Sequence, residues 1–180
     1  VHSHATKEDM ENFQTIYAKN VGAVTAPATG LHFSRELMKR MEIKGINTAF
    51  LTLHCSLSNF SQIEVEDLSK HKMDSEAMTV SKECCDLVNK TKDQAKATET
   101  ATGTDGYLKE YDGWTSKFIF PPYDYQLADS MIANFYHPES TLVMSTAAFG
   151  GYENVMECYR LAVEHGYKFG CFGDSLLIVD

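Results

Sequence analysis

Residues 22–55 constrain the fold more than any other stretch, because two apolar segments flank one well-delimited helix. GAVTAP (22–27) has the composition of a short strand, and Ser34 is a good N-cap for the helix SRELMKRMEIK. That helix is expected to end at Gly45, which can adopt the left-handed conformation that follows many helices. INTAFLTLHC (46–55) is rich in β-branched and apolar residues and predicts a largely buried strand. Strand, helix and strand in succession predict a βαβ unit.

The remaining sequence continues this alternation of helix-like and strand-like segments. Helical spacing or a serine N-cap predicts helices over about residues 7–19, 81–96, 140–151 and 152–166. Apolar runs predict strands near residues 76–80, 114–120, 167–172 and 175–179. The length of 180 residues and the 43% hydrophobic content suit one domain with a sizeable core. We therefore expect a single α/β domain over residues 1–180.

Composition excludes several classes of partner. The 16 basic and 25 acidic residues give a net charge of -9, which argues against attraction of the whole surface to nucleic acid or an anionic membrane, although a local basic patch stays possible. The five cysteines form no CxxC pair, so we expect neither a disulfide framework nor a zinc knuckle, and a cytoplasmic location. No apolar run approaches the roughly 18 residues of a membrane span, and VHSHATKEDMENF lacks the apolar core of a signal peptide. We expect no membrane association.

Two histidines at the ends of predicted strands are the first candidate site residues. His32 follows Gly30 in the loop between the first strand and its helix, and His54 ends the next strand. Ligand-binding side chains of α/β proteins converge at such positions. A packed histidine in a capping loop is the commoner explanation for His32, and a hydrogen-bonded rim histidine explains His54 equally well.

Three further polar segments could contribute acids, bases or anion contacts. HKMDSE (71–76) places several such groups close together, although a solvated loop is the commoner reason for six polar residues in a row. NFYHPEST (134–141) ends where a helix begins, so its free N–H groups either bind an anion or are simply capped. FGDS (172–175) is either a turn or part of a site. The candidates in these segments are His71, Asp74, Ser75, Glu76, His137, Ser140, Thr141 and Asp174.

Known catalytic signatures are absent from the sequence. It has no P-loop, no GxGxxG, no GxSxG and no Cys-His signature. A metal site built from His32, His54, His71 and His137 is conceivable, but no pair shows ligand spacing on one element, and we expect none. From local chemistry alone, the sequence predicts an α/β domain with polar loops at strand ends.

Six motifs together resemble one known family. They occur in this order: APATGLHF, AFLTLHC, HKMDSE, DGWTSKFIFPPY, NFYHPESTLVM and YKFGCFGDSLLI. Their order and approximate spacing are similar to those of the S-adenosylmethionine:tRNA ribosyltransferase-isomerases, the QueA family of queuosine biosynthesis. The resemblance runs from about FQTIYAKN to the last residue. Several motifs in one order are far more specific than any single one.

The resemblance implies a reaction on tRNA. Family members transfer the ribosyl part of S-adenosylmethionine to 7-aminomethyl-7-deazaguanine at the wobble position of tRNAs with a GUN anticodon. They isomerise it to epoxyqueuosine, and adenine and methionine leave. S-adenosylmethionine is consumed as a substrate, so no resident cofactor or metal is implied. The expected chain is a monomer.

The resemblance also suggests roles for the candidate residues. The reaction needs a base for the ribosyl carbon beside the sulfonium and an acid for the departing adenine, and His32 and His54 are the first choices. Glu76 could orient a histidine, assist deprotonation or balance the sulfonium charge. Gly30 would permit close backbone approach, and Phe33 or Phe135 could stack on a base. The substrate-binding candidates are Thr29, Gly30, Phe33, His71, Ser75, Asn134, Phe135, His137, Ser140, Thr141 and Asp174.

The sequence departs from the family in length and in several motifs. Family members are about twice as long, so residues 1–180 correspond to their C-terminal half. The small β-barrel domain and a GTTxxR segment near residues 96–97 are missing. The family's APTAGLHF is APATGLHF here, HVGxGTF is HCSLSNF, and NFHLP is NFYHP, in which the histidine has moved by one position.

The family fold implies a mixed-sheet or distorted α/β-barrel-like catalytic domain. Because of these departures, two other functions stay open. The chain could be a binding or scaffold module without catalytic activity, or an enzyme that acts on a small nucleoside without tRNA.

Overall fold

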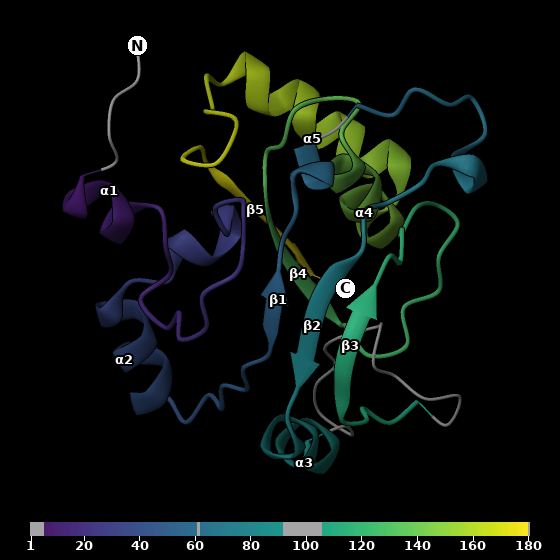
Figure 1. Cartoon of the computed structure of the whole chain (residues 1–180). Helices are drawn as coiled ribbons and strands as arrows, with labels where there is room; N and C mark the ends of the chain where they lie inside the picture. Colours follow the sequence, from purple (N-terminus) through teal and green to yellow (C-terminus); the bar gives the residue numbers. More distant parts are fainter. Residues whose placement is uncertain (1–5, 61, 92–105, 180) are drawn as a thin grey trace.

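Two small antiparallel sheets organise the structure (Figure 1). The computed structural model describes residues 6–60, 62–91 and 106–179. The first sheet has the order β1-β2-β3, with strands at Thr52–His54, Glu76–Val80 and Tyr111–Thr115. The second pairs β4 (Ser130–Asn134) with β5 (Ser175–Val179). With its five α-helices in the described ranges, the chain is a mixed α/β protein, as the sequence predicts.

The first core forms where α3 (Lys82–Lys90) packs against β2. Ser81 caps this helix, since its hydroxyl accepts a hydrogen bond from the Cys84 N–H. The buried face of the helix consists of Cys84, Cys85 and Val88. It meets Met78 and Val80 of β2 together with Leu108 and Leu127.

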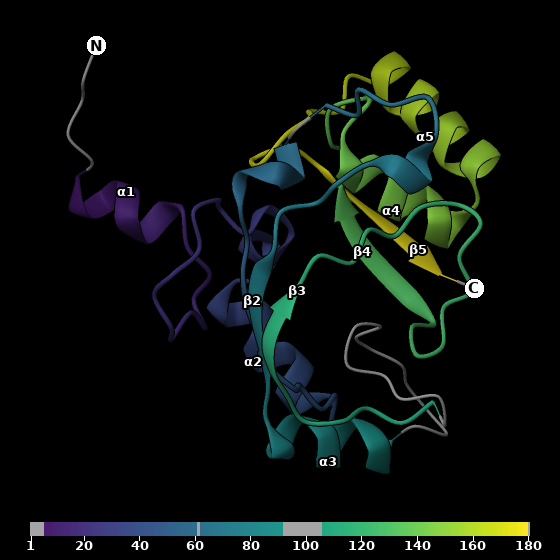
Figure 2. The ribbon, with the colours of Figure 1, turned by 45° about the vertical axis from the view of Figure 1, so that its right-hand side comes forward.

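The second core lies between the β4–β5 pair and two helices, α4 (Thr141–Gly150) and α5 (Tyr152–Glu164). Figure 2 shows both helices on the same side of this pair. Gly151, with a φ of 78°, makes the sharp turn between the helices. The buried side chains are Phe135, Val143, Ala147, Val155, Tyr159 and Ala162.

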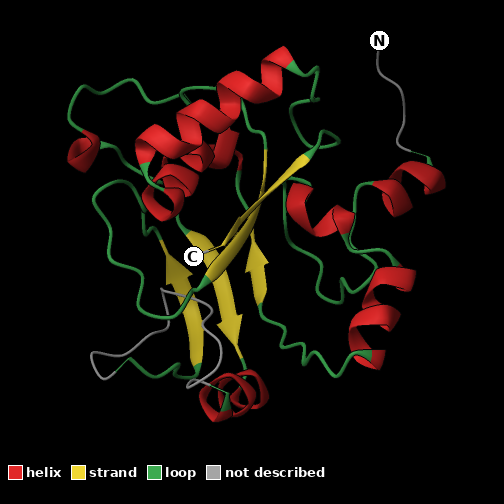
Figure 3. Ribbon diagram, turned by 180° about the vertical axis from the view of Figure 1, so that it is seen from behind, coloured by secondary structure: helices red, strands yellow, loops and turns green. Residues whose placement is uncertain are grey.

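The N-terminal part packs more loosely. It contains α1 (Lys7–Asn12), the short 3-10 helix η1 (Ala28–His32) and α2 (Arg35–Ile43). Ser34 caps α2 and Gly45 follows it with a φ of 74°, as the sequence predicts, but none of the nine residues of α2 is buried. Figure 3 shows that loops make up most of the rest of this part. Two more 3-10 turns, η2 (Leu57–Phe60) and η3 (Leu68–Lys70), follow β1.

Several sequence predictions are confirmed. The serine-capped helices at Ser34, Ser81 and Ser140 form, and so do the strands at residues 76–80 and 175–179. The helix before Gly166 also forms, and Gly166 has a φ of 74°. These elements share strong local signals, namely a cap or a stop residue next to a periodic apolar pattern.

Other predictions are wrong. Residues 22–27 form no strand, and the buried strand predicted over 46–55 shrinks to Thr52–His54, since Ile46 and Phe50 are each 48% exposed. The predicted βαβ unit therefore does not form, and every strand pair within residues 6–60, 62–91 and 106–179 is antiparallel. An apolar run remains exposed when no neighbouring layer covers it.

Three element boundaries also differ. The first helix ends at Asn12 rather than near residue 19, and residues 13–17 form turns and bends instead. The third strand lies at 111–115 rather than 114–120, and residues 167–172 form a turn instead of a strand. The strand at Ser130–Asn134 was not predicted.

Two further findings concern the described part of the chain alone. No helix within it has both the length and the apolar character needed to cross a bilayer. The predicted helix over 81–96 ends at Lys90, and the predicted gap in the GTTxxR region near residues 96–97 lies outside the described residues.

Candidate functional site

A pocket of about 860 Å³ opens between the N-terminal part and the edge of the first sheet. Its walls come from within residues 14–30, 48–55 and 79–87, together with Tyr136 and Leu142. Figure 1 shows the chain between α1 and α2 beside β1, where these segments meet. The volume is in the range of sites that bind small molecules.

The short helix η1 forms one wall of this pocket. Thr29 and Gly30 face the pocket, and the helix begins after Pro27, which supplies no side-chain cap. A Cβ at Gly30 would lie 2.6 Å from the Thr15 side chain and 2.7 Å from the Tyr17 hydroxyl. Only glycine therefore allows this close approach between η1 and the segment before it.

His54 lines the pocket from the end of β1. The backbone of Gly22 passes directly against its imidazole ring, because a Cβ at Gly22 would lie 2.6 Å from Nδ1. The Val24 N–H donates to the Cys55 carbonyl at 2.9 Å, and Asn20 Nδ2 donates to Thr52 Oγ1 at 2.8 Å. These two hydrogen bonds hold residues 20–24 beside β1 and so keep the ring of His54 at the pocket.

Glu76 is the first residue of β2 and does not line the pocket. Its carboxylate is 9% exposed and accepts a hydrogen bond from the Ser56 N–H at 2.7 Å. Burial, and to a smaller extent the charge of Glu76, raises the pKa of the Cys55 thiol to about 11. Cys55 therefore carries a proton at neutral pH and is a poor nucleophile there.

Tyr136 is a pocket residue that the sequence analysis missed. Its hydroxyl lies 2.8 Å from Thr29 Oγ1, and either oxygen can be the donor. The predicted candidate His137 is the next residue; it is exposed, with Nδ1 2.6 Å from the Pro138 carbonyl oxygen, and does not line the pocket. The signal that could have identified Tyr136 is its position in the motif, third in NFYHP, where NFHLP has its histidine.

Of the predicted site residues, the structure brings Thr29, Gly30 and His54 together in the pocket. His32 ends η1 and is exposed, and Phe33 follows it, so both lie beside this wall but outside the pocket lining. On the 71–76 segment, the His71 ring packs 5.0 Å from that of Phe118, and Ser75 is exposed. Neither residue lines the pocket.

The remaining predicted residues are buried, cap a helix or hold a turn. Asn134 is fully buried, and its amide donates to the Gly170 carbonyl at 3.1 Å. Phe135 is 4% exposed and packs against Tyr159, Tyr167 and Phe169, which corrects its predicted role as a base-stacking surface. Ser140 caps α4 through the Val143 N–H, and Thr141 is buried beside it. Asp174 accepts from the Lys168 N–H at 2.8 Å and closes a turn.

The donor set of the site does not resemble a metal centre. Within residues 6–60, 62–91 and 106–179, no three His, Cys, Asp or Glu side chains lie close enough to hold a metal ion. The pocket lining offers one imidazole, several hydroxyl groups, the charged side chains of Lys19 and Glu83, the amides of Gln14 and Asn20, and apolar residues. Such a lining suits a small polar organic ligand and one proton-transfer group.

Comparisons with known proteins agree with the motif resemblance. A family model described as "Queuosine biosynthesis protein" matches residues 2–178. A relative from Phocaeicola vulgatus, named S-adenosylmethionine:tRNA ribosyltransferase-isomerase, is 60% identical in a match that covers 97% of this chain and 53% of the relative. A relative of the same name from Bacteroides fragilis is 57% identical with the same coverage.

A solved structure gives the same result. The structure of an S-adenosylmethionine tRNA ribosyltransferase from Thermotoga maritima superposes with a TM-score of 0.67 and 31% identity, covering 84% of this chain and 51% of that one. The chain spans about half the length of the curated relatives it matches. On the family model and these relatives together, the chain belongs to the queuosine biosynthesis protein family.

Proposed function

We propose that this chain carries the S-adenosylmethionine-binding part of a tRNA ribosyltransferase-isomerase. The ribosyl group of S-adenosylmethionine is transferred to 7-aminomethyl-7-deazaguanine in a tRNA with a GUN anticodon and is isomerised to epoxyqueuosine, and adenine and methionine are released. The observation that supports this best is that Thr29 and Gly30 of the TGLH segment line the same pocket of about 860 Å³ as His54. Both motifs belong to the family pattern.

In this proposal, His54 handles the proton beside the sulfonium. It is the one histidine among the described residues that line the pocket, and Thr29 is another lining residue. The buried carboxylate of Glu76 accepts from the Ser56 N–H just after β1, where a negative charge favours a nearby cation such as a sulfonium. His32 lies on the adjacent end of η1 and is the proposed acid for adenine release. Of the other predicted site residues, Ser75 and His137 are exposed and are the proposed contacts for the larger tRNA substrate.

The remaining assignments complete the proposal. The chain corresponds to the C-terminal half of its longer relatives, and its sheets belong to a distorted barrel-like catalytic domain. It works as a monomer in the cytoplasm, with S-adenosylmethionine as a consumed substrate and no resident cofactor or metal.

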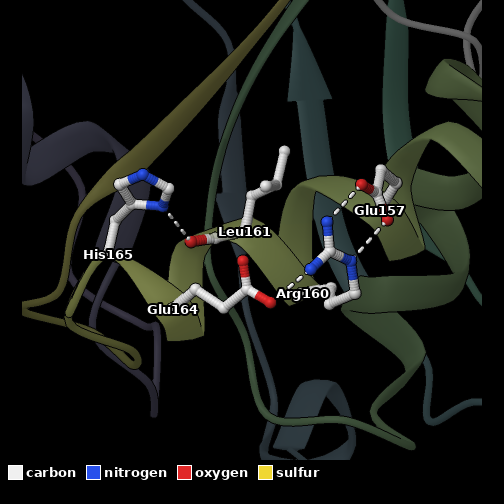
Figure 4. Close-up of polar contacts among 5 residues, drawn as sticks. All are labelled: Glu157, Arg160, Leu161, Glu164 and His165. Carbon is white, nitrogen blue, oxygen red and sulfur yellow. Dashed lines mark hydrogen bonds and ion pairs between the residues drawn. The ribbon is translucent and has the colours of Figure 1, made fainter.

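Adenine release tests the function. The chain is incubated with S-adenosylmethionine and with tRNA that carries 7-aminomethyl-7-deazaguanine, and free adenine and the modified nucleoside are measured. His54→Gln should lower the rate by about 100-fold, since a positioned acid or base contributes at least that much. His165→Gln is the matched control, because His165 lies at the far end of α5 with Nδ1 2.9 Å from the Leu161 carbonyl oxygen (Figure 4).

Each alternative has its own outcome. Binding of S-adenosylmethionine without adenine release would indicate a scaffold module. Adenine release that does not depend on tRNA would indicate an enzyme acting on a small nucleoside. If the wild-type chain neither binds S-adenosylmethionine nor releases adenine, the proposed function is wrong.

A further inference from the structure

Tyr136 is hydrogen-bonded at both of its ends. Its side-chain hydroxyl pairs with the Thr29 hydroxyl at 2.8 Å, and its backbone N–H donates to the Tyr159 hydroxyl at 2.9 Å. Thr29 belongs to η1 and Tyr159 to α5, so one residue connects two elements that are 130 positions apart in sequence (159 − 29). No residue role assigned to the proposed reaction uses this connection.

The α5 end of the connection is rigidly packed. Tyr159 is 8% exposed, and its ring lies 5.3 Å from that of Phe135 and 5.7 Å from that of Phe169. Tyr136 packs against the same core. Burial raises the pKa of Tyr159 to about 12, so its phenol stays protonated over the whole neutral range. The hydroxyl that accepts from Tyr136 is therefore fixed in place and in protonation state.

The η1 end is weakly held by its own residues. η1 has five residues, and a 3-10 helix of this length is marginal without tertiary contacts. Pro27 gives it no side-chain cap, and Gly30 lies in its middle. The hydroxyl pair with Tyr136 thus supplies a specific tether at Thr29, the position where η1 faces the pocket.

We infer that Tyr136 is a positioning residue, which transfers the rigidity of the α5 core to η1 and so keeps Thr29 and Gly30 in place as a wall of the pocket. This inference rests on the proposed function, because the ligand for which the wall is positioned is S-adenosylmethionine. The hydroxyl pair uses one of its two protons internally, which leaves one O–H free to donate to a bound ligand.

Conservative substitutions separate this role from simple packing. Tyr136→Phe and Thr29→Val each remove one hydroxyl and keep nearly the same shape, whereas Thr29→Ser keeps the hydroxyl. Tyr125→Phe is the control, because its hydroxyl donates to the Ser145 carbonyl at 3.2 Å and Tyr125 does not line the pocket.

The first measurement is S-adenosylmethionine affinity by calorimetry. We expect Tyr136→Phe and Thr29→Val each to weaken binding about three- to tenfold, the range for loss of one buried hydrogen bond. The double variant should be no weaker than either single variant, because both remove the same bond. Thr29→Ser should bind more tightly than Thr29→Val, because it restores the hydroxyl, and Tyr125→Phe should bind like wild type. Equal affinity in Tyr136→Phe and wild type, or a loss in Tyr125→Phe as large as that in Tyr136→Phe, would overturn the inference.

The second measurement needs no ligand. Amide hydrogen exchange of the free chain should speed up at residues 28–34 in Tyr136→Phe and not in Tyr125→Phe, with the melting temperature of Tyr136→Phe close to that of wild type. Unchanged exchange there would overturn the inference even if ligand binding were weakened. If wild type binds no S-adenosylmethionine while the exchange difference is present, the proposed function fails and the positioning role of Tyr136 stands.

Discussion

One phenylalanine ring is buried in the C-terminal unit, residues 130–179, and another is half exposed in the N-terminal segment, residues 13–54. In the first, the Phe135 ring is 4% exposed and contacts three other aromatic rings. In the second, the Phe50 ring is 48% exposed and lies 5.3 Å from that of Tyr17. Both segments are rich in apolar residues, so composition does not explain the difference. What differs is whether a helix layer covers the strands.

The pocket lies where these two regions meet. His54 and η1 belong to the loosely packed segment, and Tyr136 belongs to the well-packed unit. A binding wall of low intrinsic stability can adjust to a ligand, while its tether to a rigid core limits that adjustment. We therefore expect residues 130–179 to supply most of the folding stability, and residues 13–54 to adjust their conformation when a ligand binds.

The largest difference in the free energy of unfolding should appear when a phenylalanine is replaced by alanine in each of the two regions. Phe135→Ala should lower the free energy of unfolding by about 3–5 kcal/mol, because it leaves a cavity in an aromatic core. Phe50→Ala should lower it by less than about 1 kcal/mol, since half of that ring is already in water. Urea unfolding at equilibrium measures both. Similar losses for the two variants would contradict the difference in packing.

A smaller loss of folding stability should appear at high pH, because the Cys55 thiol titrates there. Its thiol has a pKa raised to about 11 in the folded chain, against about 9 in the unfolded chain. Between these values the unfolded chain loses the proton and the folded chain keeps it, so the stability should fall as pH rises from about 9 to 11. We expect this thiol to contribute about 1–2 kcal/mol of the loss, allowing for its partial exposure.

Urea unfolding at pH 8 and pH 10.5 checks this in wild type and in Cys55→Ser, which does not titrate there. The loss should be smaller in the variant. An equal loss in both chains would show that burial of the Cys55 thiol does not cause this pH dependence.

The smallest effect should come from the surface of α5. Arg160 donates to both carboxylate oxygens of Glu157 at 2.8 and 2.6 Å and also pairs with Glu164 (Figure 4). About half of each of these side chains is exposed, so solvent screens the pairs. Arg160→Ala should change the melting temperature by about 2 °C or less, and by less still in 0.5 M salt. A larger loss would show that the surface of α5, and not its buried face, stabilises this unit.

Local signals in the sequence predicted the helices well. Ser34, Ser81 and Ser140 each cap a helix as expected, because capping involves only neighbouring backbone groups. The strands at 76–80 and 175–179 were found for a similar reason, since each is a short β-prone run between turn residues.

Predictions that depend on distant partners failed or stayed incomplete. Residues 46–55 have the composition of a buried strand, yet β1 pairs with β2 alone and most of the run is exposed. Tyr136 was not among the candidates, because the sequence does not tell which side chain of a turn faces a pocket formed by η1, 107 residues earlier than Tyr136 in the case of Thr29. Thr29, Gly30 and His54 were the part of the site that strand-end reasoning could find.

Hydrogen exchange with and without S-adenosylmethionine tests most directly whether the pocket at this boundary is the ligand site. The 180-residue chain is labelled in both states, and the exchange of each peptide is compared by mass spectrometry. The account predicts slower exchange at residues 25–34 and 52–56, with no change at the C-terminal end of α5, residues 157–166. Slower exchange confined to other segments, or none in the presence of saturating ligand, would contradict it.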